Sequence, residues 1–316
     1  LYVLLSIIAV SVILILILMG CAQEIEIGEI VNAFSGKDST APVLLSVSME
    51  SSLIVRLEFS EPVKIYGSSF GQGTARADGK LIFVSLNSSL PPGKKSTVSG
   101  RVKDYSGNTS GFSVQVWGFN PNLPKILINE FTSKGTEKSP DRTELKVLSR
   151  GNLNGMTLYN GTPNDWDSLL ILPDMEVREG DYVVIWWTAS LPEGQSEEPG
   201  GGVHNICAKT DGLSSNNGGL VLCDNPSAGA HITDAVLYSN FSTSNSGFGT
   251  KTALERANWI LKTGRWKGDA VDSTASTATR SMSRKENIDD TDTCKDWFIT
   301  VTGGSTFGSA NSSQEF

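Results

Sequence analysis

The sequence predicts an all-β protein made of two β-sandwich domains in tandem. Apolar and polar residues alternate over many short segments, which is the period of a half-buried strand. The 32 Gly and 12 Pro, together with frequent Ser, Thr and Asn, suit many short strands joined by turns. Helical periodicity is nearly absent, and only residues 251–262 predict a short helix.

The first domain is predicted over residues 41–118. Turn signals at 77–80 (Ala-Asp-Gly-Lys) and 91–94 (Pro-Pro-Gly-Lys) separate its alternating segments. In one segment, Val55, Leu57 and Phe59 would share one face of a strand. The strands are expected at 44–48, 53–59, 81–86, 97–102 and 112–117.

A linker is predicted at 119–124, because its two prolines disfavour a continuing strand ladder. The second domain is predicted over 125–316. Its strands are expected at 125–131, 142–147, 155–159, 168–172 and 181–187.

A long loop insertion is expected in the second domain at about 188–250. Residues 193–202 and 211–219 are rich in Gly and Ser, which is typical of flexible loops. They flank 203–207 and 219–223, which could pair as strands. Long loops at one end of a sandwich usually carry binding, so any ligand surface is expected within 190–245.

The N-terminal stretch is apolar and uncharged from Leu1 to Met19, apart from two serines, and it ends in Leu18-Met19-Gly20-Cys21. This ending resembles the lipobox of bacterial lipoprotein signal peptides. The resemblance implies that residues 1–20 are a signal peptide, that Cys21 is acylated, and that 21–40 form a flexible tether. Multiple acyl chains would meet the requirement for stable anchoring.

An uncleaved transmembrane helix is the alternative, since nineteen residues span roughly 28 Å at about 1.5 Å per residue. A signal peptide normally opens with Met and a basic region, and neither is present, so we expect the recorded start to be truncated. Both interpretations place residues 22–316 outside the cytoplasm.

Two motifs of the first domain, Phe59-Ser60-Glu61-Pro62-Val63 and Asp104-Tyr105-Ser106-Gly107-Asn108, are similar to the bacterial Ig-like domains of surface proteins. The resemblance implies an Ig-like β-sandwich over 41–118. Physically, Asp104 and Asn108 can stabilise a turn around Gly107. The alternative role for Asp104 is that of a calcium ligand.

The second domain resembles the lamin-tail domain, an Ig-like β-sandwich found on nuclear lamins and many exported bacterial proteins. The resemblance rests on an ordered set of motifs: Ile128-Asn129-Glu130-Phe131, Glu144-Leu145, Leu153–Leu158, Ser281–Arg284, Asp296-Trp297-Phe298 and Thr306–Asn311. Two positions depart from the family pattern, because Met156 replaces Trp and Phe307 replaces Pro. The resemblance implies a lamin-tail-like sandwich over 125–316.

Cys207, Cys223 and Cys294 remain once Cys21 is assigned to lipid, which is an odd number for an oxidising compartment. A Cys207–Cys223 disulfide is expected, and its loop of about 16 residues would contribute roughly 3 kcal/mol. Cys294 could replace either partner. The same sulfurs could instead form a zinc site with His204 and His231.

Asp289, Asp290 and Asp292 form an acidic run that could bind calcium through hard oxygen ligands. The run lacks the Gly and the terminal Glu of an EF-hand loop, which favours a solvated turn. No resident metal and no cofactor are therefore expected.

The formal charge of −8 and the scattered Lys and Arg argue against a nucleic-acid partner. Hydrolase, P-loop and zinc-protease motifs are absent from the sequence. The expected function is that of a non-enzymatic lipoprotein, exported to the bacterial cell envelope, that binds a protein or glycan partner. Any exposed tryptophan would point to such contact. The alternatives are an accessory component of an exported hydrolase or nuclease, and a structural spacer.

Overall fold

The computed structural model describes residues 38–67, 70, 73–210, 212–242 and 248–316. The predicted signal peptide, the lipobox residues Leu18, Met19 and Gly20, and the lipidation site Cys21 lie outside these residues. Among the residues described, none of the helices combines the length and apolar character needed to cross a membrane.

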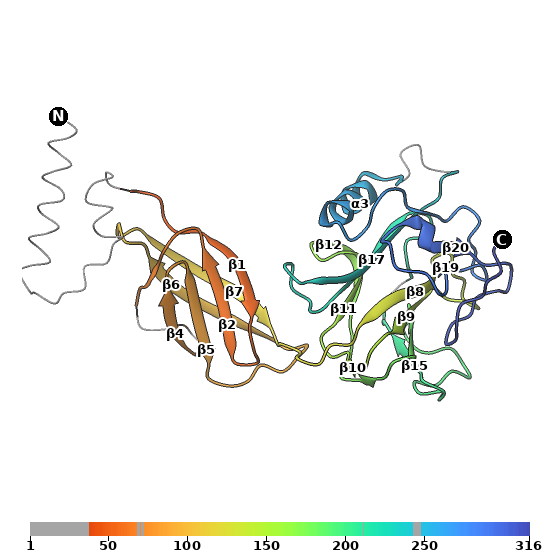
Figure 1. Cartoon of the computed structure of the whole chain (residues 1–316), viewed down its shortest axis with the longest axis horizontal. Coiled ribbons are helices and arrows are strands. Elements are labelled where there is room, and N and C mark those ends of the chain that lie inside the picture. Colours follow the sequence, from red (N-terminus) through yellow and green to blue (C-terminus); the bar gives the residue numbers. More distant parts are fainter. Residues whose placement is uncertain (1–37, 68–69, 71–72, 211, 243–247) are drawn as a thin grey trace, which may run out of the picture.

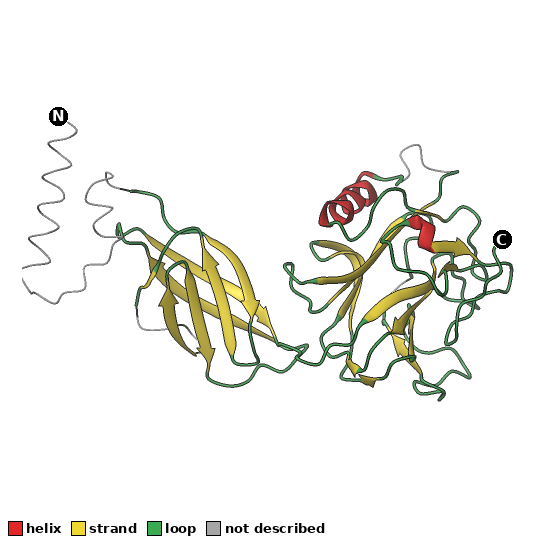
Figure 2. Cartoon of the chain, in the orientation of Figure 1, coloured by secondary structure: helices red, strands yellow, loops and turns green. Residues whose placement is uncertain are grey.

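The chain forms an all-β protein with two lobes, as the alternating segments predicted (Figures 1 and 2). The first lobe contains seven strands: β1 (Leu44–Met49), β2 (Ile54–Phe59), β3 (Lys64–Ile65), β4 (Gly73–Asp78), β5 (Leu81–Leu86), β6 (Lys95–Lys103) and β7 (Thr109–Trp117). They form two sheets, in the orders β1-β2-β5-β4 and β3-β6-β7. This is the strand order of an immunoglobulin constant-type sandwich.

The core of the first lobe lies between these two sheets. Val55, Leu57 and Phe59 are almost fully buried on one face of β2, as their alternation predicted. The ring of Phe59 meets that of Phe112 on β7, with 5.8 Å between the centroids. Gly100 on β6 leaves room for Phe70 and Phe112, because an added Cβ would lie 2.8 Å from the first ring and 3.1 Å from the second.

The second lobe has a larger core, enclosed by two further sheets. The first has five strands in the order β12 (Asp165–Ile171), β11 (Thr157–Thr162), β16 (Gly218–Cys223), β17 (Ile232–Ser239) and β18 (Val271–Asp272). The second has six strands in the order β15 (Val203–Cys207), β14 (Tyr182–Trp186), β9 (Arg142–Val147), β8 (Ile126–Thr132), β19 (Met282–Arg284) and β20 (Trp297–Ile299). A short pair, β10 (Gly151–Asn152) and β13 (Glu176–Val177), completes the lobe.

Helix α3 (Lys251–Thr263) packs on the five-stranded sheet, on the face turned away from the six-stranded sheet (Figure 1). The sequence predicted this helix to within one residue. Thr250 caps its N-terminus by accepting a hydrogen bond from the backbone N of Ala253, and Gly264 ends it in a left-handed conformation. Buried Ile260 fits against Gly219, where an added Cβ would lie 2.6 Å from its Cδ1 atom.

The loop insertion predicted at 188–250 contains three strands, β15, β16 and β17, and β16 is the central strand of the five-stranded sheet. The strands expected at 203–207 and 219–223 are present as β15 and β16, but the stretch is part of both sheets and not an inserted loop. The prediction that 203–207 and 219–223 pair is wrong. Strand β15 pairs in parallel with β14, whereas β16 pairs with β11 and β17. Gly and Ser dominate the turns of this region, but Leu220, Val221 and Leu222 build the core.

The linker at 119–124 is tied to the second lobe. The side-chain amide of Asn120 donates to the carbonyl oxygens of Asn152 and Asn154, both at 2.9 Å. The turn holding Gly93 abuts the turn holding Gly155, whose Cβ, if present, would lie 2.8 Å from the backbone N of Gly93. These contacts set the position of one lobe relative to the other.

Candidate functional site

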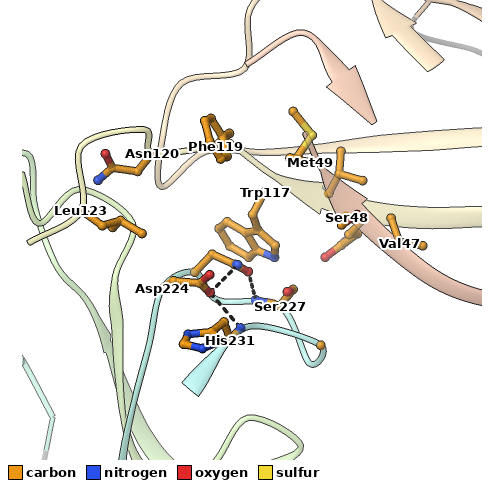
Figure 3. Close-up of a pocket in the computed structure, with 15 residues that line it drawn as sticks. Val47, Ser48, Met49, Trp117, Phe119, Asn120, Leu123, Asp224, Ser227 and His231 are labelled. Atoms are coloured by element: carbon orange, nitrogen blue, oxygen red, sulfur yellow. Dashed lines mark hydrogen bonds between the residues drawn. The ribbon is translucent and has the colours of Figure 1, made fainter. Parts of the chain in front are cut away.

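A pocket of about 280 Å³ lies at the junction of the two lobes (Figure 3). We call it the junction pocket. The first lobe contributes residues of β1 and the end of β7, the linker contributes Phe119, Asn120 and Leu123, and the second lobe contributes the β16–β17 turn. Neither lobe alone forms this pocket, so its shape depends on the contacts that fix the linker.

Trp117 provides the largest aromatic surface of the junction pocket. It is the last residue of β7, it is only half-buried, and Figure 3 shows its ring between the strand of the first lobe and the turn of the second. Val47 and Met49 from β1 line the same pocket. A half-exposed indole offers apolar area for stacking and an N–H donor, which suits contact with a ligand.

The opposite wall is the turn that begins at Asp224. Its Oδ1 atom accepts hydrogen bonds from the Asn225 side-chain amide at 2.7 Å and from the backbone N of His231 at 3.0 Å. The Asn225 Oδ1 atom accepts from the backbone N of Ser227 at 2.9 Å. Burial raises the pKa of Asp224, and the hydrogen bond from the His231 backbone offsets part of that rise. These bonds hold a carboxylate and an amide rigidly beside the aromatic surface.

His231 and Asp224 do not form an acid–base dyad. The Nε2 atom of His231 lies 2.9 Å from Nη2 of Arg265, and only the backbone of His231 contacts the carboxylate. A general base needs its ring nitrogen within reach of the proton that it moves. The arrangement of indole, carboxylate, amide and imidazole is therefore suited to binding through stacking and hydrogen bonds.

The comparisons with known proteins bear on the second lobe. The family model TP_1001_2nd, described as a protein second domain, matches residues 124–299, which is more than half of the chain. The chain belongs to this family. No curated protein matches the chain. The crystal structure of dimeric latent PorU from Porphyromonas gingivalis aligns with 63% of this chain and 20% of that chain, at 12% identity and a TM-score of 0.19.

The predicted Cys207–Cys223 disulfide is not formed. Both residues are free thiols, and they lie on strands of different sheets, β15 and β16. The prediction failed because it assumed that the two segments pair side by side. Cys294, in a short 3₁₀-helix (Cys294–Asp296), is also a free, half-buried thiol.

The four residues of the possible zinc site do not come together. His204 on β15 contacts two carboxylates, with Nδ1 2.8 Å from Glu198 and Nε2 3.2 Å from Asp181. Burial lowers the pKa of His204, but the hydrogen bonds with Glu198 and Asp181 outweigh it and the net shift is upward. His231 lines the junction pocket instead, and Cys223 is buried in the five-stranded sheet.

Two of the three aspartates in the possible calcium site lie close together, but the third member of the group is Asp234 and not Asp289. Carboxylate oxygens of Asp290, Asp292 and Asp234 lie within 4.8 Å of one another. The guanidinium of Arg284 contacts Asp234 at 3.0 Å and Asp290 at 2.6 Å. A buried arginine therefore already supplies the positive charge that these carboxylates need.

Asp104 has the turn-stabilising role. Its Oδ1 atom accepts from the backbone N of Asn108 at 2.8 Å, and its Oδ2 atom accepts from the Asn108 side chain at 2.7 Å. Asp38 and Glu61 lie close by, with ligand-type oxygens within 4.8 Å of those of Asp104. Burial raises the pKa of Glu61, and the charges of Asp104 and Asp38 add to that rise.

Trp117 and Asp224 were not singled out as site residues from the sequence. Trp117 ends a predicted strand, where an aromatic residue is most often part of the core. Asp224-Asn225-Pro226-Ser227 has the composition of a turn, and that signal was available. The turn does fall within 190–245, the stretch in which a ligand surface was expected.

Proposed function

We propose that this protein is a non-enzymatic lipoprotein of the bacterial cell envelope that binds a protein or glycan partner in the junction pocket. The observation that carries the proposal is the placement of half-exposed Trp117 opposite Asp224 in a pocket built from both lobes. Aromatic side chains at pocket centres commonly dominate binding energy, with rigid polar groups providing selectivity.

We further propose that the first lobe is a bacterial Ig-like domain and the second a lamin-tail-like domain. The strand order of the first lobe supports the former. For the latter, motif residues far apart in the sequence share one buried network. Asn129 donates to Glu144 at 2.7 Å and to Asn311 at 3.0 Å, and the backbone N of Thr306 donates to Glu130 at 3.0 Å.

The anchor is proposed from the lipobox alone. Cells fed an alkyne-tagged fatty acid should label the full-length protein, and Cys21→Ser should abolish the label. In detergent phase separation the wild type should enter the detergent phase. A wild-type protein that carries no label and stays in the aqueous phase would contradict the anchor.

Binding is tested with the full chain in detergent, immobilised and exposed to solubilised envelope proteins and to an array of bacterial glycans. A captured partner is identified, purified and titrated by calorimetry. Trp117→Ala should weaken its affinity by about tenfold or more, since a central aromatic typically contributes above about 1.4 kcal/mol. Trp166→Ala removes a tryptophan with 45% exposure that does not line the pocket and serves as the matched control.

Equal binding by wild type and Trp117→Ala would contradict the junction pocket as the binding site. Absence of any ligand would favour a structural spacer. Turnover of an envelope substrate by the purified protein would contradict the non-enzymatic assignment.

A further inference from the structure

The outer face of the three-stranded sheet in the first lobe is basic. Strand β6 buries Val98 and Val102 against the core, so its odd-numbered side chains point outward, and the register with β3 places Lys64 beside them. None of the strands β3, β6 and β7 contains an Asp or Glu, and Asp104, which follows β6, is buried. We call this surface the basic face, and its cations are Lys64, Lys95, Arg101 and Lys103.

The positive charge of this face is not balanced by neighbouring carboxylates. On the opposite outer face of the same lobe, Arg76 forms an ion pair with Asp78 at 3.2 Å. Within the described part of the chain, no carboxylate forms an ion pair with Lys95, Arg101 or Lys103. Residues 38–118 contain eight Lys and Arg against six Asp and Glu, although the whole chain has a formal charge of −8. The first lobe therefore differs in charge from the rest of the protein, and its unpaired cations share one face.

Tyrosine rings lie among these cations. Tyr66 is 43% exposed, and its ring centroid lies 5.4 Å from the guanidinium carbon of Arg101 and 5.8 Å from Nζ of Lys103. Nζ of Lys64 lies 4.3 Å from the centroid of the Tyr105 ring. Exposed tyrosine beside basic side chains suits the boundary of a membrane, because the ring enters the headgroup layer while the cations meet the lipid charges.

A shallow hollow of about 630 Å³ opens on the basic face beside Arg101. Ser99 and Ser113 are cross-strand partners that line it, and neither hydroxyl is hydrogen-bonded to a described residue. Gly111, the partner of Arg101, leaves the hollow open, because an added Cβ would meet nothing closer than 3.9 Å. A guanidinium flanked by two hydroxyls supplies the donors that a phosphate group accepts from.

The described chain begins at one end of the basic face. The side-chain amide of Asn108, in the turn between β6 and β7, donates to the carbonyl oxygens of Asp38 at 3.0 Å and Thr40 at 3.1 Å. Sixteen residues separate Asp38 from Cys21, and they reach at most about 55 Å. Acylation of Cys21, as proposed above, would keep the basic face within that distance of a lipid surface, and the inference below rests on it.

We propose that the basic face docks the first lobe on a membrane that contains anionic phospholipids, with a lipid phosphate in the hollow bonded to Arg101, Ser99 and Ser113. A lipid surface suits this face better than a soluble polyanion, because the segment that leads to Cys21 ends beside it and Tyr66 offers apolar area. The second lobe carries most of the Asp and Glu residues, so the same membrane repels it and only the first lobe docks.

The test uses the acylated full chain in nanodiscs of phosphatidylcholine, either alone or with about one third phosphatidylglycerol. A water-soluble reagent acetylates exposed lysines, and peptide mass spectrometry gives the rate at each one. Lys95 and Lys103 should react about fivefold more slowly in the anionic discs, and high salt should remove the difference. Lys138, exposed on the second lobe, is the internal standard and should react equally in both.

Variants test the charge and the hollow separately. Arg101→Gln should reduce the protection of Lys95 and Lys103 about fivefold. Arg76→Gln removes the same charge from the opposite face, is the matched control, and should keep the protection. Gly111→Leu fills the hollow without changing the charge and should weaken the protection. Thermal transitions check that each variant folds, and if one does not, the comparison of the two discs with wild type decides.

Equal acetylation of Lys95 and Lys103 in the two kinds of disc would overturn the proposal. So would equal protection in Arg101→Gln and Arg76→Gln. Protection by inorganic phosphate in phosphatidylcholine discs, with none from phosphatidylglycerol, would assign the hollow to a free anion. Protection by polyglucuronate alone would assign the face to an acidic glycan. Unchanged protection in Gly111→Leu would contradict the hollow as the phosphate site.

The same digests separate this proposal from that of the anchor. The mass of the peptide that contains Cys21 shows whether the residue is acylated. An acylated protein with equal labelling in both discs would overturn docking and leave the anchor standing. A protein without acyl chains would contradict the anchor, and with it the nearness of the membrane on which docking depends.

Discussion

Glu130 on β8 and Glu144 on β9 are cross-strand partners, and both are fully buried in the second lobe. They hold the C-terminal segment against the sheet. Glu130 accepts hydrogen bonds from Ser281 and from the backbone N and Oγ1 of Thr306, and Glu144 accepts from Asn129 and from the backbone N of Gly308. Burial raises the pKa of both, that of Glu144 to about 8, and the charge of Glu130 adds to the rise at Glu144.

This pair makes stability depend on pH. The folded-state pKa of Glu144, about 8, lies above the ordinary glutamate value of 4.5, so the folded protein keeps a proton that the unfolded chain has lost. The free energy of unfolding should therefore fall as the pH rises from about 4.5 through 8, by at most about 1.4 kcal/mol per pH unit from this group. Glu144→Gln should reduce that slope in denaturant titrations at a series of pH values.

The control for this titration is Glu137→Gln, because Glu137 is exposed on the same lobe. It should keep the wild-type slope. An identical slope in wild type and Glu144→Gln would show that the carboxyl titrates at its ordinary value. Other buried acids with raised pKa values, such as Asp234 at about 6, contribute in the same direction, so only the difference between variants is interpreted.

Arg284 compensates the charge of Asp234 in the interior. Its Nη2 atom lies 3.0 Å from Asp234, its Nε atom donates to the carbonyl of Ile128 at 3.0 Å, and both charged residues are buried. Arg284→Met leaves the carboxylates without a cation and should lower the free energy of unfolding by about 3–5 kcal/mol. Denaturant unfolding measures the loss.

The double variant Arg284→Met/Asp234→Asn should recover part of that stability, because it removes the uncompensated charge. A double variant no more stable than Arg284→Met would contradict the charge-based explanation. The stability that Arg284 contributes would then come mainly from its packing on Trp297, whose ring centroid lies 4.9 Å from the guanidinium carbon.

The three described cysteines should differ in reactivity. Burial raises the pKa of Cys223 to about 12, and the nearby Asp224 adds to the rise, so this thiol is both enclosed and protonated. Thiolates are the reactive form. Iodoacetamide should modify Cys207 and Cys294 faster than Cys223 in the native protein, and all three at similar rates in denaturant. Peptide mapping without reduction should find no Cys207–Cys223 bond; finding one would contradict the placement of the two strands.

Gly155 should be needed for the arrangement of the lobes. It has φ +88°, and an added Cβ would meet the backbone N of Gly93 at 2.8 Å. Gly155→Ala should lower stability by about 1–3 kcal/mol through backbone strain and should also change the angle between the lobes, as measured by small-angle X-ray scattering. Gly180 has φ +89° with nothing within 4 Å of its added Cβ. Gly180→Ala should therefore lower stability through the same backbone strain but leave the scattering curve unchanged. Equal changes in scattering for both variants would show that the contact between Gly155 and Gly93 does not set the angle between the lobes.

The elements that were predicted well have a local pattern. Strand β9 lies at 142–147 and β5 at 81–86, as expected, and α3 begins at Lys251 as expected. In each element, one face is buried, so apolar residues recur at the spacing of a strand or a helix. That spacing can be seen in the few residues of the element itself. Strand β4 was missed because its side chains are small or charged. Strand β17 was missed because it is buried on both faces, so its residues do not alternate.

The motifs on which the resemblance to the lamin-tail domain rests lie close together in the second lobe. They contain Glu130, Glu144, Thr306 and Asn311, which meet in one network. The departure at Phe307 has a structural explanation, because the guanidinium of Arg142 stacks on its ring at 3.9 Å from the centroid. A proline there would offer no such surface.

By itself, the amino-acid sequence determined that this chain folds into sandwiches of short strands, because alternation and turn residues are local properties. Which sheet each strand joins was decided only in the tertiary structure. That assignment separates Cys207 from Cys223 and brings Trp117 to Asp224. Contacts between residues more than a hundred positions apart depend on strand order and on the packing of whole sheets, and neither is encoded in the neighbourhood of any single residue.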